Sequence, residues 1–90
     1  MFESYYRNVI FKFLDKIEEG TVILNDDMSK TFGSGKPEVT IEVASPRFYR
    51  RAVLGGDLGF AESYAKSEWV ADNLTNLITI LLLNKERLSG

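Results

Sequence analysis

The chain has 90 residues, of which 44% are hydrophobic and 27% charged, and eleven basic against thirteen acidic residues give a formal net charge of −2. This length accommodates one domain, assigned to residues 1–90, and the apolar content predicts a folded core rather than disorder. Neither cysteine nor histidine is present, which excludes disulfides, thiolate or imidazole metal ligands and a histidine general base. The weakly acidic balance argues against general nucleic-acid binding.

Membrane insertion and export are not indicated by any segment. The longest strongly apolar stretch, residues 77–83, is far shorter than the ~20 residues that a membrane-spanning helix needs. Residues 1–13 mix charged with apolar side chains, unlike a signal peptide. We therefore expect a cytoplasmic protein whose membrane contact would be peripheral, at the inner face.

The first segment has the spacing of an amphipathic helix that ends before Gly20. Phe11 and Leu14 lie off its apolar stripe, which predicts a further contact, with a partner domain or with a second copy in a weak homodimer. The stripe recurs at three- and four-residue steps and comprises Phe2, Tyr5, Tyr6, Val9, Ile10, Phe13 and Ile17.

The next segments predict a small antiparallel sheet with one solvated face. Residues 21–24 are rich in β-branched side chains and precede a turn that contains Asp26 and Asp27. Those two aspartates form only a fragment of a calcium-binding loop, so we interpret them as turn residues. Residues 31–33 predict a short pairing strand, and residues 38–43 alternate between apolar and polar side chains, as in a half-buried strand.

Helices are predicted for the rest of the chain. Ser45 and Pro46 are a strong start signal for a helix over residues 46–54, which the glycines at 55 and 56 end. Asp57 is expected to cap a further helix. The last helix begins after Asp72 or Asn73, and its apolar stripe comprises Leu74, Leu77, Ile78, Leu81 and Leu82. This order predicts an α+β fold, in which helices cover one face of a small antiparallel sheet.

Catalytic motifs are not indicated. Residues 55–59 (GGDLG) follow a helix rather than a strand, and Asp57 would repel a phosphate, so we interpret them as a helix end and not as a nucleotide loop. Glu62 and Glu68 are acid–base candidates only by residue type, because both positions are compatible with the surface. Trp69 fits a packed core edge better than a ligand-stacking position. The sequence therefore predicts no catalytic, cofactor-binding or metal-binding residue.

Three arginines are the candidate contact residues. Helical spacing places Arg47, Arg50 and Arg51 on one side of their helix, where the guanidinium groups can converge on an anion. The candidate ligands are a lipid headgroup and the carboxylates of a partner domain. A solvated face is the simpler alternative.

Several segments resemble the N-terminal domain of cyclopropane-fatty-acyl-phospholipid synthases. The most specific is residues 56–64 (GDLGFAESY), with Trp69 five residues on. Residues 16–20 (KIEEG), 41–43 (IEV) and 45–51 (SPRFYRR) are also similar, as is the leucine-rich last helix. Ser67 departs from the family, which usually has glycine before the tryptophan.

The resemblance implies a non-catalytic accessory domain of a lipid-modifying enzyme, with a layout that also resembles the sterol carrier protein fold. In that family an S-adenosylmethionine-dependent methyltransferase domain follows and adds a methylene across a double bond of a phospholipid acyl chain. We expect the chain to bind no cofactor itself and to act with such a catalytic domain, in cis or in trans, at a phospholipid surface. The alternative is a stand-alone lipid- or protein-binding module. Residues 85–90, a polar tail that resembles the beginning of a linker, favour the first interpretation.

Overall fold

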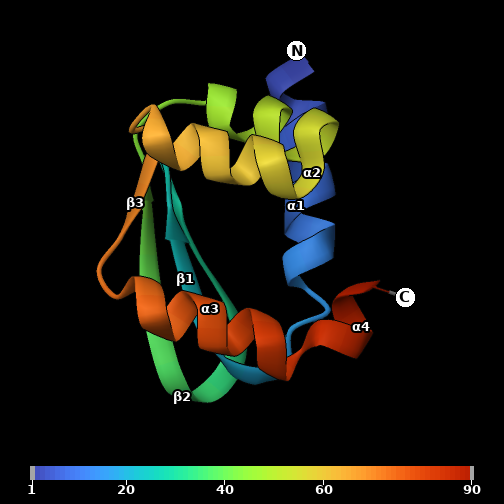
Figure 1. Ribbon diagram of the computed structural model, residues 1–90, viewed down its shortest axis with the longest axis vertical. Coiled ribbons are helices and arrows are strands. Elements are labelled where there is room, and N and C mark those ends of the chain that lie inside the picture. Colours follow the sequence, from blue (N-terminus) through green and yellow to red (C-terminus); the bar gives the residue numbers. More distant parts are fainter. Residues whose placement is uncertain (1, 90) are drawn as a thin grey trace.

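The computed structural model describes the chain from residue 2 to residue 89, with side chains from residue 4 to residue 89. It has the predicted α+β fold (Figure 1). Helices α2 and α3 cross opposite ends of the strands, and α1 runs beside them (Figure 1). The elements in chain order are α1 (Phe2–Leu14), β1 (Glu19–Asn25), β2 (Ser29–Val43), α2 (Arg47–Ala65), β3 (Trp69–Ala71), α3 (Leu74–Leu83) and α4 (Lys85–Ser89).

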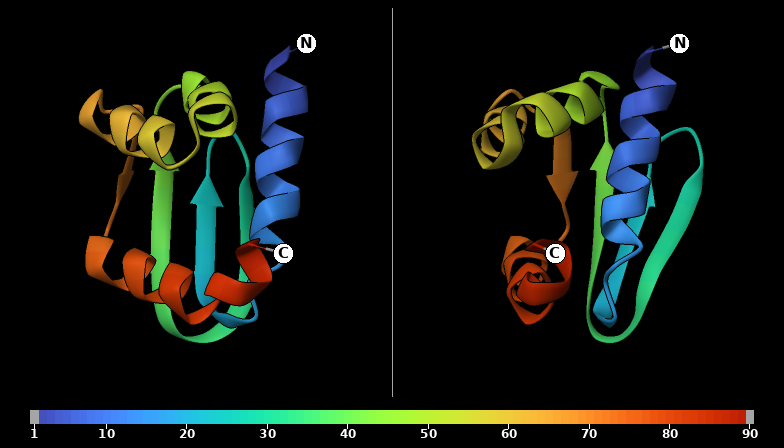
Figure 2. Two further views of the ribbon diagram at one scale, coloured as in Figure 1. Left: turned by 45° about the vertical axis from the view of Figure 1, so that its right-hand side comes forward. Right: turned by 90° about the vertical axis from the view of Figure 1, so that its right-hand side faces the viewer.

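The sheet has the order β1-β2-β3, and β2 is long enough to flank β1 on both sides. Residues 21–25 pair with residues 29–33 in reverse order, and the chain then passes the end of β1 through residues 34–37. Residues 38–42 align with residues 21–25 in the same order, so this half of β2 points the same way as β1 (Figure 2). Strand β3 pairs antiparallel with this second half.

Two glycines allow β2 to pass from one side of β1 to the other at the start of β1. Gly20 and Gly33 have φ angles of 92° and 75°, a conformation that residues other than glycine rarely adopt. A Cβ at Gly33 would lie 2.2 Å from the carbonyl oxygen of Gly20. The prediction that Gly20 ends the first helix is therefore wrong: α1 ends at Leu14, and Gly20 belongs to β1.

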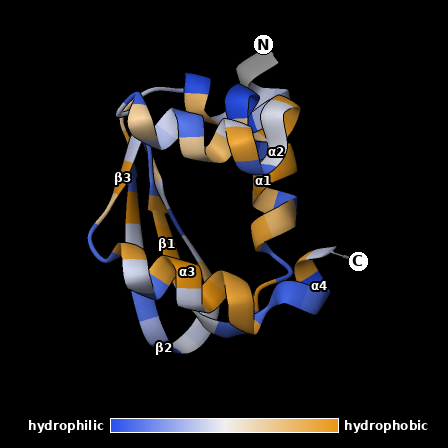
Figure 3. Cartoon of the chain, in the orientation of Figure 1, coloured by the Kyte–Doolittle hydropathy of each residue, from blue (hydrophilic) through white to orange (hydrophobic). Residues whose placement is uncertain are grey.

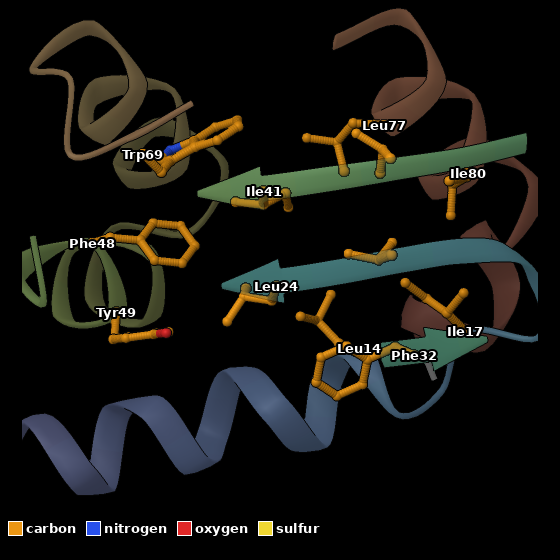
Figure 4. Close-up of a cluster of buried hydrophobic side chains, with 12 residues drawn as sticks. Leu14, Ile17, Leu24, Phe32, Ile41, Phe48, Tyr49, Trp69, Leu77 and Ile80 are labelled. Atoms are coloured by element: carbon orange, nitrogen blue, oxygen red, sulfur yellow. The ribbon is translucent and has the colours of Figure 1, made fainter. Parts of the chain in front are cut away.

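The core lies between the helices and one face of the sheet (Figure 4). Val39 and Ile41 are buried and Glu42 is exposed, which confirms the alternation predicted for this strand. Trp69 is buried as expected. The buried apolar residues are Leu14, Ile17, Val22, Leu24, Phe32, Val39, Ile41, Phe48, Tyr49, Trp69, Leu77 and Ile80.

The buried face of α1 keeps part of the predicted stripe and extends beyond it. Tyr6 and Ile10 pack against the core as predicted, and Ile17, just after the helix, is buried. Leu14 is buried, and the ring of Phe11 packs edge-on against Phe32 with centroids 5.4 Å apart, whereas Tyr5 and Phe13 are exposed. The two off-stripe residues therefore contact the core and provide no partner surface. Because this helix has apolar residues on two neighbouring faces, helical spacing is compatible with either face being buried. The side chain of residue 2, placed in the predicted stripe, lies outside the described residues.

The start of α2 follows the prediction closely. The Ser45 hydroxyl oxygen accepts a hydrogen bond from the backbone N–H of Arg47 at 3.2 Å. Pro46 has a φ of −64°, which its ring fixes in the helical range. Asp57, predicted to cap the second helix, makes no side-chain hydrogen bond to any residue between 4 and 89.

Helix α2 bends at Gly56, where φ is 58° and ψ is −138°. The bend divides it into two arms, residues 47–55 and 57–65, which are the two helices predicted on either side of the glycine pair. The arms meet at Gly59, where a Cβ would lie 1.9 Å from the carbonyl oxygen of Arg51. Only glycine fits this contact, so the sequence GGDLG serves the bend and the packing of the arms.

The last part of the chain differs from the prediction in three respects. Asn73 caps α3 as expected, by accepting a hydrogen bond from the Asn76 N–H at 3.0 Å, but β3 precedes it. Of the stripe predicted for α3, Leu77 is buried and Leu81 packs against the core, whereas Leu74, Ile78 and Leu82 are exposed. Ile80, outside the predicted stripe, is buried. Residues 85–89 form α4 rather than a polar tail, and Leu88 packs against the core. Residue 90 lies outside the described residues.

Candidate functional site

The three candidate arginines lie at one surface. Arg47, Arg50 and Arg51 line a wide depression of about 1140 Å³ between the two arms of α2. Leu54 and Leu58 line it as well and are 62% and 83% exposed. The structure thus brings the predicted residues together beside apolar side chains that the sequence analysis did not single out. We call Arg47, Arg50, Leu54 and Leu58 the α2 tip.

Two carboxylates bind Arg51, whose side chain is partly exposed. Its Nε and Nη2 donate to the two carboxylate oxygens of Glu68 at 2.9 and 3.0 Å, and its Nη1 donates to Glu62 at 3.3 Å. The hydrogen bonds from Arg51 lower the pKa of Glu68, and those to Glu68 raise the pKa of Arg51. Both groups therefore stay ionised at neutral pH.

The surface position expected for Glu68 is wrong, because its side chain is only 8% exposed. The first arm of α2 passes the start of β3 and brings Arg51 against this carboxylate. A buried carboxylate needs such a partner, since the charge is costly to desolvate alone. Arg51 is accordingly a structural residue in the isolated domain.

Arg47 and Arg50 are in a different situation. Both are exposed, and neither side chain makes a hydrogen bond or ion pair with any residue between 4 and 89. Three residues apart on one arm, they project on the same side of the helix. Their neighbours at the α2 tip are exposed leucines, so the surface combines positive charge with apolar area.

A second polar cluster joins α1, the turn after β1, and α2. Asp26 accepts hydrogen bonds from Arg7 Nε at 2.7 Å, from the Tyr49 hydroxyl at 2.5 Å and from the Met28 N–H at 2.9 Å. The last of these confirms the predicted turn. Sequence reasoning missed this cluster, because Arg7 and Tyr49 lie 19 and 23 positions from Asp26 and no local pattern links them.

The cluster is suited to structure and not to proton transfer. Burial alone would raise the pKa of Asp26, but the hydrogen bonds from Arg7, Tyr49 and Met28 outweigh it and hold that pKa well below its usual range. Burial, together with the hydrogen bond to Asp26, raises the pKa of Tyr49. Near neutral pH, Asp26 stays ionised and Tyr49 stays protonated, so neither has a pKa near the operating pH of a general acid or base.

Trp69 belongs to an aromatic cluster under the second arm of α2. Its Nε1 donates to the Ser63 hydroxyl oxygen at 2.8 Å, and its ring stacks on Phe60 with centroids 4.6 Å apart. Ser67, just before this strand, has a φ of 60°. Glycine adopts this left-handed conformation at no steric cost, and glycine is the residue that the resembled family has here.

Within residues 4–89, no group of three or more acidic residues is placed to hold a metal ion. Over the same part of the chain, no helix is long and apolar enough to cross a membrane. The chain matches no protein-family model, no curated protein and no solved structure. The resemblance to cyclopropane-fatty-acyl-phospholipid synthases and that to the sterol carrier protein fold therefore stay predictions.

Proposed function

We propose that this chain is a non-catalytic accessory domain that engages a phospholipid surface on behalf of an S-adenosylmethionine-dependent, lipid-modifying methyltransferase domain. The observation that carries the proposal is the α2 tip. Within residues 4–89 the side chains of Arg47 and Arg50 make no hydrogen bond or ion pair, and they lie beside Leu54 and Leu58. The residues that resemble cyclopropane-fatty-acyl-phospholipid synthases support the choice of catalytic partner.

The chemistry of the α2 tip suits the boundary of an anionic bilayer. A basic side chain near such a surface contributes about 1 kcal/mol, and the attraction falls off within a Debye length. Exposed leucines beside the arginines gain from transfer out of water as the surface is approached. The combination gives weak, salt-sensitive and reversible binding, as a domain that holds a catalytic partner near successive lipid substrates requires.

Arg51 has a separate part in this proposal. Its charge is compensated by Glu68 and Glu62, so it contributes little attraction to lipid. Its ion pairs fix the first arm of α2 against the start of β3. The arm then presents the guanidinium groups of Arg47 and Arg50 from a rigid support.

Vesicle co-sedimentation tests the proposal. The double variant Arg47→Gln/Arg50→Gln is expected to bind anionic phosphatidylglycerol vesicles about thirty-fold more weakly than the wild type at low salt. On neutral phosphatidylcholine vesicles, or at high salt, the two proteins should bind alike. The matched control is Lys85→Gln/Arg87→Gln on α4. It removes the same number of positive charges, but at a place far from the α2 tip. Equal binding of wild type and Arg47→Gln/Arg50→Gln to anionic vesicles would overturn the lipid contact.

Calorimetry addresses the accessory role. Titration of S-adenosylmethionine into the isolated chain is expected to give no saturable heat. Between residues 2 and 89, no glycine loop follows a strand and opens a helix, as in dinucleotide-type sites. Saturable binding at micromolar concentration would contradict a role without cofactor.

A further inference from the structure

The depression between the two arms of α2 holds three guanidinium groups and one carboxylate. Arg47, Arg50 and Arg51 line it from the first arm, and Glu62 lines it from the second. Arg50 and Arg51 follow Arg47 by three and four residues, so the three side chains start from adjoining positions on one helix surface. Figure 3 shows strongly hydrophilic and hydrophobic residues together in α2. A single anion in the depression is therefore within reach of more than one guanidinium group.

Glu62 is bound only loosely in this arrangement. It accepts a hydrogen bond from Arg51 Nη1 at 3.3 Å, and its side chain is 59% exposed. An ion pair this exposed contributes little to stability, so it opens at low cost. Loss of the contact leaves in place the two shorter bonds from Arg51 to the buried Glu68. Arg51 thus stays anchored while its outer N–H groups become available.

Two positive charges at the depression are uncompensated. The side chains of Arg47 and Arg50 make no hydrogen bond or ion pair within residues 4–89. Over the same range, the three bonds of Arg51 leave one N–H on Nη1 and one on Nη2 without an acceptor. An anion with two charges and several oxygens would match both the charge and these open donors.

A phosphomonoester has this chemistry. It carries about 1.5 to 2 negative charges near pH 7, and its three terminal oxygens are strong hydrogen-bond acceptors. A phosphodiester, as in phosphatidylglycerol, carries a single charge and has fewer terminal oxygens. Guanidinium groups bind phosphate oxygens through paired N–H donors, a geometry that diffuse attraction to an anionic surface does not require.

We propose that the depression binds the phosphomonoester headgroup of a lipid, of the phosphatidic acid class. Arg47 and Arg50 bind its oxygens, and the outer N–H groups of Arg51 join them as the ligand displaces Glu62. A singly charged ligand gains little by replacing one carboxylate, so Glu62 favours a ligand of higher charge. The inference rests on the proposed function and deepens it, because it adds recognition of one headgroup to attraction by charge.

The leucines of the α2 tip favour a lipid over a soluble phosphate ester. Leu54 and Leu58 line the same depression and are largely exposed. They gain from transfer out of water when the headgroup belongs to a bilayer. A soluble ester offers them no apolar surface.

Vesicle binding by a charge-conserving variant tests the inference. Phosphatidic acid and phosphatidylglycerol vesicles are matched in electrophoretic mobility, so that diffuse attraction is equal on both. The wild type is expected to bind phosphatidic acid about tenfold more tightly, through charge-assisted hydrogen bonds. Arg47→Lys/Arg50→Lys keeps the charge but loses the planar fork, so it should bind both vesicles as the wild type binds phosphatidylglycerol. Arg87→Lys on α4 is the control and should keep the preference.

The outcomes separate this inference from the proposed function. Equal binding of the wild type to both kinds of vesicle overturns the inference and leaves the lipid contact of the proposed function in place. A preference that Arg47→Lys/Arg50→Lys retains also overturns it, since charge alone then accounts for binding. Absence of binding to either vesicle overturns the proposed function, and the inference with it.

The exchange at Glu62 has its own test. Glu62→Gln removes the competing carboxylate and should strengthen binding to phosphatidic acid vesicles about fivefold. Glu86→Gln on α4 makes the same change in net charge and should strengthen binding clearly less. Equal effects of the two variants would overturn the displacement of Glu62.

Calorimetry identifies the source of the phosphate group. Dihexanoyl phosphatidic acid, a short-chain soluble lipid, is expected to bind about tenfold more tightly than glycerol phosphate, because its chains contact the leucines. Leu58→Ser should reduce this difference, whereas Leu82→Ser, at an exposed leucine of α3, should not. Equal affinities of the wild type for the two ligands would overturn the lipid and assign the site to a soluble phosphate ester.

Discussion

Arg50 and Arg51 are consecutive residues of the same helix, yet they lie in two different regions of the molecule. Arg51 faces the start of β3, where Glu68 and Glu62 compensate its charge. Arg50 lies at the α2 tip with Arg47 and has no partner among residues 4–89. One residue along a helix is a rotation of about 100°. That rotation separates a side chain that holds the fold together from one that is free to bind.

The largest effect on stability is expected from disrupting the packing of the two arms of α2, which positions both Arg50 and Arg51. At Gly59, an added Cβ would lie 1.9 Å from the Arg51 carbonyl oxygen, a backbone atom that cannot give way. Gly59→Ala should therefore lower the free energy of unfolding by about 3 kcal/mol, as severe overpacking does. Urea denaturation measures the change. Gly55→Ala is the control, since nothing lies within 4 Å of a Cβ there, and its stability should not fall.

Arg7 is the other arginine with a partner inside the protein, and losing the carboxylate of Asp26 should lower stability. Asp26→Asn removes the charge that Arg7 and Tyr49 bind, and we expect the free energy of unfolding to fall by about 1.5–3 kcal/mol at pH 7. Asp27→Asn, at the exposed neighbouring residue, is the control and should leave stability unchanged.

The same variant predicts the direction of the pH dependence. The folded-state pKa of Asp26 lies below the ordinary value of 3.8, so the unfolded chain binds its proton first as the pH falls. Stabilisation by Asp26 is thus complete above about pH 5 and is lost progressively below about pH 4. Thermal melts of wild type and Asp26→Asn should converge as the pH falls below 4. A constant difference between their melting temperatures down to pH 2 would contradict the assignment.

Converting the paired arginine into an unpaired one would sharpen the comparison. Glu68→Gln removes the main partner of Arg51 and leaves it only the longer contact with the exposed Glu62, at 3.3 Å. The guanidinium in the depression at the α2 tip is then compensated less. Binding to anionic vesicles at low salt should then strengthen by up to about fivefold. Glu86→Gln on α4 makes the same change in net charge elsewhere. If both variants bind equally more tightly, only the total charge matters and the distinction between the arginines fails for lipid binding.

The smallest effect concerns the residue that leads into β3, where Arg51 is anchored. Ser67 has a φ of 60°, and Ser67→Gly should raise the free energy of unfolding by about 0.5–1 kcal/mol by relieving backbone strain. Gly56→Ala is the reverse experiment, because Gly56 also has a positive φ and should lose stability. Calorimetric melting temperatures that move in opposite directions would agree with both expectations.

Local sequence signals predicted much of the fold. The alternation over residues 38–43, the start of α2 at Ser45 and Pro46, and the interruption at the glycine pair each depend on neighbours within a few positions. The crossing of β2 around β1 was not predicted. It depends on the close approach of Gly20 and Gly33, which are too far apart in the chain for the patterns of neighbouring residues to link them.

The candidate site was predictable only in part. The helical spacing of the arginines placed all three at one depression, but nothing local showed that Arg51 would meet Glu68, seventeen residues away. The apolar stripes of α1 and α3 were right only in part, for another reason. Both helices have more than one apolar face, and hydrophobic periodicity alone does not decide which face meets the sheet.

The path of β2 around β1 also bears on how the chain reaches its native state. Both neighbours of β1 in the sheet come from the next segment of the chain, and its aligned partners lie at most 17 positions away, as between Thr21 and Glu38. Closing such short loops costs little entropy, and topologies with local contacts fold fast. Residues 19–43 can thus form the first organised unit, with α2, β3 and α3 adding to it afterwards. The central strand is then enclosed on both edges from an early stage, and its backbone is never offered to another chain as an open template.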